Sequence, residues 1–284
     1  MADVVITSMV GGIGNQLYGW ATAAAAASRA GIDLVLELSS YERDPFGRTF
    51  ILPKLGIAGV RTSSYNRMQR AAIGAMARIA NGRQGHFGFA GRSLYTEVGG
   101  RLNPAILDRR LSGRCYLRGY WQSARYFADY AGELRKAVKF EPCNAVHARS
   151  DMVCVHIRSF KEVSAPGIVR LDRDYYEKAY ARCFSRFAHP AFVVYSDDLQ
   201  WAKDKAMLPA TYEAGGQSHT ADCSDRDLCE LVCMSRFQNF IIGNSSFSWW
   251  AAYLNDRSPW VQAPGRHRHA WFSEEPLPVE WEEA

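Results

Sequence analysis

The segment from Val153 to Glu162, V-C-V-H-I-R-S-F-K-E, is an apolar run that ends abruptly in polar and charged residues. Its first half alternates apolar side chains with others, which predicts a buried β-strand. The polar end is then the carboxyl end of that strand, where open α/β sheets bind their ligands. His156 and Arg158 are two residues apart, so both side chains leave the same face of the strand. An arginine fixed there offers a planar fork of donors suited to a diphosphate. The alternative is a surface arginine beside a core histidine.

Patterns typical of strands and helices alternate along the whole chain, which predicts an α/β fold with parallel sheets. A first strand at 4–9 leads through Gly11, Gly12 and Gly14 into an alanine-rich helix that ends at Ala30 and is capped by Gly31. The turn lacks the G-x-G-x-x-G spacing, so an ordinary NAD site is not expected. Further strands are predicted at 32–38, 153–157, 192–195, 239–243 and near 260–261, and further helices at 66–84, 172–187, 199–206, 225–236 and 247–255. Residues 82–91 are predicted to form a mobile loop.

Charge and length suggest two domains with different roles. The chain has 284 residues, and a mixed polar stretch containing Pro142 predicts a boundary between domains 1–141 and 142–284. No acidic residue stands between Asp44 and Glu97, and segment 61–92 is rich in arginine. Its helix either packs on its own domain or rests on an anionic membrane or charged acceptor. A nucleic-acid role is not favoured, because no aromatic residues are regularly interleaved with the arginines.

The chain has the composition of a soluble globular protein, with 48% hydrophobic and 22% charged residues. Its seven cysteines include no C-x-x-C pair and no zinc-type spacing, which favours a reducing compartment. We expect no signal peptide, and no apolar run in the sequence is long enough to span a bilayer. We therefore expect a cytoplasmic protein, with peripheral contact to the inner membrane as the further expectation from the basic segment.

Polar residues follow three predicted strands of the second half of the chain. These residues are His156 and Arg158, then Ser196, Asp197 and Asp198, and finally Asn244, Ser245 and Ser246. Such clustering at strand ends is typical of a nucleotide site on a parallel sheet. Arginine pairs with a diphosphate, an aspartate accepts from a guanine edge or a ribose hydroxyl, and serines that open a helix donate to anions. Singly, Asp198 or Ser246 could merely cap the next helix.

Five blocks of sequence carry a more specific resemblance. They are G-G-I-G-N-Q-L-Y at 11–18, G-Y-W-Q-S-A-R-Y-F at 119–127, V-H-I-R at 155–158, Y-S-D-D-L-Q-W-A-K at 195–203 and I-I-G-N-S-S-F-S-W-W-A-A-Y-L-N at 241–255. In this order they resemble the alpha-1,2-fucosyltransferases of glycosyltransferase family 11. The resemblance implies a GT-B-type fold, with two Rossmann-like domains facing across a cleft and the acceptor on the N-terminal side. It also implies transfer of L-fucose from GDP-fucose, with inversion and without a metal, to the 2-hydroxyl of a galactose-type residue. The acceptor is then an O-antigen repeat on a lipid carrier or a free oligosaccharide, and the arginine-rich helix favours the former.

The resemblance also assigns roles to individual residues. Arg158 would hold the GDP diphosphate and neutralise the leaving group, and His156 would line the same pocket. Asp197 or Asp198 would read the guanine. The remaining donor contacts would come from Asn244, Ser245, Ser246 and Phe247, and from Gly12, Gly14, Asn15 and Gln16 of the other domain.

The segment after the histidine departs from the family. The usual run there is R-R-G-D-Y, whereas this chain has Arg158 followed by S-F-K-E. Glu162 is then the candidate catalytic base, unless transfer through an oxocarbenium-like path needs none or Glu162 only pairs with Lys161 or Arg170. The departure keeps two alternatives open, a GT-B transferase for another nucleotide sugar or linkage and a nucleotide-sugar-binding protein without catalysis.

Overall fold

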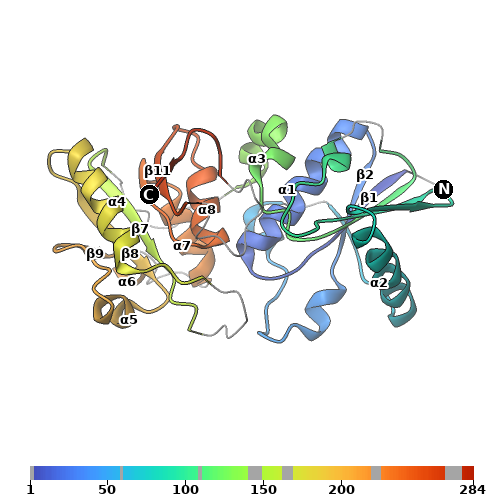
Figure 1. The fold of residues 1–284 in the computed structure, drawn as a ribbon, viewed down its shortest axis with the longest axis horizontal. Coiled ribbons are helices and arrows are strands. Elements are labelled where there is room, and N and C mark those ends of the chain that lie inside the picture. The colour runs from blue at the N-terminus through green and yellow to red at the C-terminus, as the bar shows by residue number, and fades with distance from the viewer. Residues whose placement is uncertain are drawn as a thin grey trace. The chain divides into compact units, whose positions relative to one another are not determined.

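The computed structural model describes residues 3–57, 60–107, 111–139, 149–161, 169–218, 225–265 and 277–284. The chain divides into two compact units, here called unit 1 for the described residues up to Lys139 and unit 2 for those from Arg149 onwards. The predicted boundary between residues 141 and 142 lies outside the described residues. Each unit has its own sheet and its own helices (Figure 1).

Unit 1 is built on a sheet with the strand order β3-β2-β1-β6-β5-β4, in which only the β4–β5 pair is antiparallel among the strands described. The strands are β1 (Val4–Ser8), β2 (Asp33–Glu37), β3 (Arg61–Ser63), β4 (His86–Phe89), β5 (Arg92–Thr96) and β6 (Arg114–Arg118). The α-helices are α1 (Ile13–Ala30), α2 (Arg67–Asn81) and α3 (Ala131–Ala137). Short 3-10 helices span Ser39–Arg43, Leu52–Leu55, Pro104–Leu107, Ala124–Tyr126 and Ala128–Tyr130.

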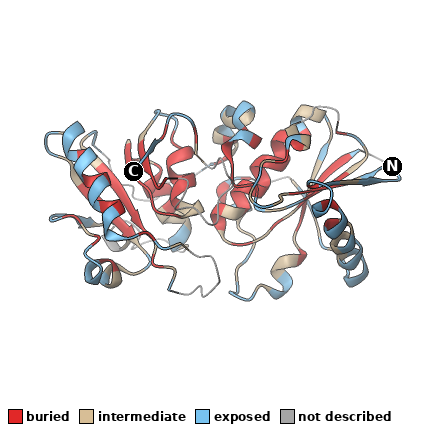
Figure 2. Ribbon diagram, viewed as in Figure 1, coloured by how far each residue is buried: buried red, intermediate tan, exposed pale blue. Residues whose placement is uncertain are grey.

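The glycine-rich turn and its helix form as predicted. Gly11 has a φ of +73°, which a side chain rarely adopts, and Gly12 is the N-cap of α1. The helix ends at Ala30, where Gly31 takes the left-handed conformation with a φ of 67°. The alanine-rich helix is buried along most of its length (Figure 2). The parallel pairing of β1 with β2 confirms that the first two predicted strands and the helix between them form a βαβ unit of a parallel sheet.

The prediction of a mobile loop at 82–91 is wrong. Residues 86–89 form strand β4, which pairs antiparallel with β5. Ala90 and Gly91 connect the two strands with φ values of 50° and 71°. Positive φ at both central residues is the geometry of a tight two-residue hairpin. The glycines in this stretch therefore belong to a defined hairpin turn.

Helix α2, which was predicted at 66–84, is amphipathic. Its N-terminus carries a capping box in which the side chains of Asn66 and Gln69 accept from each other's backbone N–H. Ala77 and Ala80 are buried against Leu94 of β5, so the helix packs on its own unit. The opposite face is exposed to solvent (Figure 2).

Unit 2 contains a sheet with the strand order β12-β11-β10-β7-β8-β9, and every pair of neighbouring strands that is described runs parallel. The strands are β7 (Met152–Ile157), β8 (Ala191–Ser196), β9 (Glu213–Ala214), β10 (Asn239–Ile241), β11 (Trp260–Ala263) and β12 (Glu282–Glu283). The helices are α4 (Arg173–Arg186), α5 (Leu199–Asp204), α6 (Gly215–Ser218), α7 (Arg226–Met234) and α8 (Ser246–Tyr253).

The core of unit 2 is rich in aromatic side chains. Tyr175 and Tyr176 of α4 pack against β7 and β8, and Trp249 and Trp250 of α8 are fully buried. Four cysteines are free and buried, as expected of small apolar side chains, namely Cys115, Cys154, Cys183 and Cys233. Cys229, by contrast, is disulfide-bonded. Among the described helices, none is both long enough and apolar enough to cross a bilayer.

Candidate functional site

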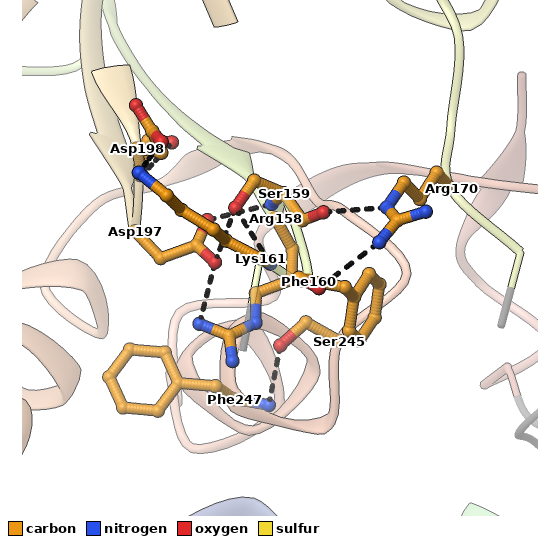
Figure 3. A network of polar contacts seen from close by, with 10 residues as sticks. Arg158, Ser159, Phe160, Lys161, Arg170, Asp197, Asp198, Ser245 and Phe247 are labelled. Atoms are coloured by element: carbon orange, nitrogen blue, oxygen red, sulfur yellow. Dashed lines mark hydrogen bonds and ion pairs between the residues drawn. The ribbon is translucent and has the colours of Figure 1, made fainter. Parts of the chain in front are cut away.

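The predicted polar clusters meet at one edge of the sheet in unit 2. Strand β7 lies between β8 and β10, and all three run parallel, so their carboxyl ends share one edge. His156 pairs in register with Tyr195, which places Arg158 beside the residues that follow β8. Figure 3 shows the Arg158 side chain with Asp197 on one side and with Ser245 and Phe247 of the third strand end on the other.

Asp197 holds Arg158 and the backbone after β7. Its Oδ2 lies 3.0 Å from Nη1 of Arg158 and accepts from the Ser159 hydroxyl at 2.8 Å. Its Oδ1 accepts from the Ser159 N–H at 2.7 Å. Both carboxylate oxygens are therefore engaged, and the guanidinium is held in one orientation by a charge-assisted contact. The assigned role of reading guanine stays a prediction for Asp197.

The turn after Arg158 is strained and clamped. Phe160 has a φ of 54°, a left-handed conformation that costs a residue with a side chain about 1–2 kcal/mol. Arg170 donates from Nε to the carbonyl of Ser159 at 2.8 Å and from Nη2 to the carbonyl of Phe160 at 3.2 Å (Figure 3). The Arg158 guanidinium carbon lies 5.5 Å from the centre of the Phe160 ring, within range of a cation–π contact.

Asp198 has a structural position at the start of α5. Its side chain accepts from the Trp201 N–H at 2.9 Å and pairs with Lys161 Nζ at 3.1 Å. The Trp201 hydrogen bond, reinforced by Lys161, lowers the pKa of Asp198. Helix capping, one alternative that the sequence left open, therefore applies to this residue, and Lys161 brings its charge to the same strand end.

His156 is buried next to Arg158. Burial lowers the pKa of His156 to about 4, and the Arg158 charge acts in the same direction while Asp197 opposes it. The imidazole is therefore neutral at physiological pH, and its buried Nδ1 has no hydrogen-bond partner among the described residues. Its ring centre lies 6.0 Å from that of Phe247. A Cβ on Gly243 would lie 2.8 Å from the His156 carbonyl oxygen, so this position has no room for a side chain.

The third strand end opens helix α8. Ser245 is the N-cap, and its hydroxyl accepts from the Phe247 N–H at 3.3 Å. Ser246 is the first residue of the helix, and the Asn244 amide donates to the Val169 carbonyl at 3.0 Å. Because β10 leads into α8 and pairs with β7, the positive end of the helix dipole lies at the same sheet edge as Arg158 (Figure 3).

The predicted donor contacts of unit 1 lie at the start of α1. Gly12 has open space where a Cβ would stand, whereas Gly14 is buried within the helix. Asn15 accepts from Gln122 at 2.9 Å. Gln16 is buried and donates to the Thr49 carbonyl at 2.8 Å, which ties the following loop to the helix. Donor binding by these residues stays a prediction, and the candidate base Glu162 lies outside the described residues.

Sequence reasoning missed three residues that shape this site. Ser159 and Arg170 hold the strained turn, and Gly243 makes room for the His156 backbone. Of the three, only Gly243 could have been noticed in the sequence, because it stands between a predicted strand and a helix cap in the block at 241–255. No group of three or more His, Cys, Asp or Glu residues that could hold a metal ion occurs in the described part of the chain.

Comparison with known proteins identifies the family to which the chain belongs. Residues 109–275 match the model of glycosyl transferase family 11. An alpha-1,2-colitosyltransferase of Escherichia coli is 25% identical over 98% of both chains. The O-antigen biosynthesis glycosyltransferase WbnK of Escherichia coli is 30% identical over 40% of each chain.

A solved structure supports the fold. A mutant of FUT1 from Arabidopsis thaliana, solved in complex with GDP, is similar with a TM-score of 0.55 and 13% identity, covering 95% of this chain and 72% of the other. At this level of identity the likeness concerns the fold alone, and it confirms the GT-B-type α/β class. The chain belongs to glycosyl transferase family 11, as the sequence blocks predicted, and is a glycosyltransferase.

Proposed function

We propose that the protein is an inverting, metal-independent alpha-1,2-fucosyltransferase. It moves L-fucose from GDP-fucose to the 2-hydroxyl of a galactose-type residue in a glycan of the O-antigen kind. The observation that carries the proposal is the Arg158 guanidinium, held 3.0 Å from Asp197 beside the N-terminus of α8. Two sources of positive potential thereby converge at the carboxyl edge of a parallel sheet, where a diphosphate is expected.

The proposed step needs charge stabilisation at the leaving group. The bond between the anomeric carbon of fucose and the β-phosphate oxygen breaks, and its electron pair leaves with GDP. The 2-hydroxyl oxygen of galactose forms the new bond from the opposite face and releases its proton to Glu162, the candidate base, or to water. Arg158 stabilises the negative charge that develops on the diphosphate, which is the role that a metal ion plays in other transferases. His156, being neutral, contributes a hydrogen-bonding ring without adding charge.

The similarity to a colitosyltransferase supports a second candidate for the donor sugar, colitose. The relative that aligns over 98% of both chains is named an alpha-1,2-colitosyltransferase. Transfer of colitose from a GDP-linked donor would use the same diphosphate contacts and differ only at the sugar. The two candidates therefore share the Arg158 site and predict different donor sugars.

We also propose that α2 brings the protein to an anionic membrane surface. Met68 and Ile79 are 82% and 43% exposed on the outer face of the helix, and Phe89 at the tip of the adjacent hairpin is 74% exposed. Arg67 and Arg78 are exposed on the same helix. Apolar side chains flanked by arginine fit the interface of an anionic bilayer. Sedimentation with vesicles should then require anionic lipid and should weaken in Met68→Asp.

The deciding experiment is a calorimetric titration of the protein with GDP, UDP and GDP-fucose in EDTA, followed by product analysis with galactose-terminated acceptors. Guanine-selective binding without a metal and formation of an alpha-1,2-fucosyl product would support the proposal. A higher turnover with GDP-linked colitose would select the second donor. Preference for UDP, or a requirement for manganese, would refute both, and GDP binding without transfer or donor hydrolysis would identify a binding protein.

A further inference from the structure

A second pocket lies at the corresponding sheet edge of unit 1. It occupies about 430 Å³, within the usual size of small-molecule sites. The pocket is formed where β1, β2 and β6 end and where α2 begins, and its lining includes Glu37, Tyr65, Arg70, Arg118 and Tyr120. A smaller pocket of about 290 Å³ adjoins it, because Arg118 lines both. These are carboxyl ends of parallel strands, the edge at which α/β sheets bind ligands.

Arg118 is the residue in this pocket most available to a ligand. It forms no hydrogen bond or ion pair with any described residue, whereas Arg70, which also lines the pocket, pairs with Glu42 at 2.8 Å. Nη1 of Arg118 lies beside α2, 3.7 Å from where a Cβ on Gly74 would stand. The hydroxyl of Tyr65 is buried and also has no hydrogen-bond partner among the described residues.

The mixture of groups indicates the chemistry of the ligand. The pocket offers a free guanidinium together with serine hydroxyls and the Glu37 carboxylate, so it presents both donors and acceptors. A phosphate group would be matched by donors alone, and a carboxylate would repel it. A sugar hydroxyl both donates and accepts, so a neutral sugar fits this lining. The Tyr120 ring, which is 44% exposed, provides an apolar surface for the C–H face of a pyranose.

Glu97 holds the turn that presents Tyr120. Its Oε2 accepts from the Tyr120 N–H at 2.9 Å and from the Trp121 N–H at 2.6 Å. Trp121 has a φ of 55°, and a Cβ on Gly119 would lie 2.8 Å from the same oxygen. The G-Y-W part of the block at 119–127 is therefore a compact turn folded around one carboxyl group.

We propose that this pocket is the site of the acceptor sugar, a neutral galactose-type pyranose, with Arg118 as a binding residue and Glu97 as a positioning residue for the Gly119–Trp121 turn. The inference rests on the proposed function, because it names the acceptor site of that reaction. It assigns the sugar to residues at the end of β6 that the donor site does not use.

The test uses lactose as the acceptor probe and GDP-fucose as the donor, with the full chain. Arg118→Ala should raise the KM for lactose at least tenfold, while the Kd for GDP and the rate of donor hydrolysis without acceptor stay within twofold of the wild type. Arg173→Ala, which removes an exposed arginine of unit 2 that lines neither pocket, should leave the KM unchanged. Glu97→Gln keeps an oxygen acceptor for both N–H groups and should raise the KM less than Glu97→Ala does. An unchanged KM in Arg118→Ala would overturn the assignment.

Saturation-transfer NMR separates failure of the pocket from failure of the proposed function. If the wild type does not transfer fucose, lactose signals that are saturated by the wild type and by Arg173→Ala, but not by Arg118→Ala, would still support the acceptor site. If the wild type saturates no lactose signal, or if Arg118→Ala saturates it equally, the pocket is not a galactoside site.

Discussion

Each unit has an arginine at the carboxyl end of a central strand, Arg118 in unit 1 and Arg158 in unit 2. The two side chains have different surroundings. Arg158 follows β7 and is fixed by Asp197 at 3.0 Å, within a turn that Arg170 clamps from the other side. Arg118 ends β6 and has no partner among the described residues. The first arrangement is organised before any ligand arrives, whereas the second leaves the guanidinium adaptable.

This difference matches what each edge is proposed to bind. A nucleotide diphosphate has a fixed shape and charge, so a pre-oriented guanidinium avoids the entropy loss of ordering it on binding. A sugar acceptor presents hydroxyls whose directions vary from glycan to glycan, and an unpaired arginine can follow them. Under these two proposals, similar sheet topologies within one chain support a rigid anion site and an adaptable polar site.

The largest expected effect comes from removing the fixed arginine. Arg158→Ala should lower kcat/KM at least a hundredfold, or about 3 kcal/mol, because one preorganised charge on the leaving group is lost. GDP affinity should fall as well, while the Tm stays close to that of the wild type. Arg173→Ala provides a matched control, since that arginine is exposed on α4 and, among the described residues, pairs with Glu177 alone. Near-normal turnover in a folded Arg158→Ala protein would remove this residue from the mechanism.

Two glycines test how closely each strand end is packed. A Cβ at Gly243 of unit 2 would lie 2.8 Å from the His156 carbonyl oxygen, so Gly243→Ala should destabilise the protein by about 2 kcal/mol through overpacking. A Cβ at Gly12 of unit 1 would meet nothing within 4 Å, so Gly12→Ala should change the stability by less than about 1 kcal/mol. Urea denaturation of both variants measures the contrast. Equal free energies of unfolding would show that the two edges are packed alike.

The sequence predicted the parts of this comparison that depend on local patterns. Alternating apolar residues located β7, β8 and β10, and the polar residues after them meet at one edge because the strands are parallel. Contacts between distant segments were out of reach. Arg170 reaches Ser159 from eleven residues further along the chain, and nothing in its own neighbourhood marks it as a clamp. The left-handed φ of Phe160 was equally hidden, since phenylalanine does not favour that conformation.

The pocket of unit 1 was hidden for a related reason. Its lining comes from several strand ends and from α2, and the unpaired state of Arg118 is a property of the folded chain. The hairpin at 86–96 was misjudged as a loop because its glycines were taken as a sign of mobility instead of a tight turn.

The pH dependence of stability should show a smaller effect, and it should differ between Glu97 of unit 1 and Asp198 of unit 2. Burial raises the pKa of Glu97 to about 7, although the Trp121 and Tyr120 N–H groups oppose the shift. Between about pH 4.5 and 7 the folded state then binds more protons than the unfolded state, so stability falls as the pH rises. Glu97→Gln, which cannot ionise, should match the wild type at pH 5 and exceed it by about 1–2 kcal/mol at pH 8.

Asp198 of unit 2 serves as a control, because its effect on stability should depend on pH in the opposite direction. The Trp201 N–H and Lys161 lower the pKa of Asp198, so its charged form favours folding. Asp198→Asn should therefore be less stable than the wild type at pH 8, and the deficit should shrink as the pH falls through the range in which aspartate is protonated. Thermal unfolding at pH 5 and pH 8 checks Glu97→Gln, and the comparison for Asp198→Asn extends to pH 3, where aspartate is protonated. A pH-independent gain for Glu97→Gln would contradict the assigned role of burial.

The smallest expected effect concerns the strain at Phe160. Glycine adopts a φ of 54° without strain, so Phe160→Gly should be more stable than Phe160→Ala by about 1 kcal/mol, even though glycine loses more entropy on folding. Both variants lose the ring 5.5 Å from the Arg158 guanidinium and should weaken GDP binding to a similar extent. Denaturant unfolding and GDP titration of the two proteins separate strain from ring contact. If the alanine variant were the more stable, the turn would not be strained, and the rigidity of this edge would rest on Asp197 and Arg170 alone.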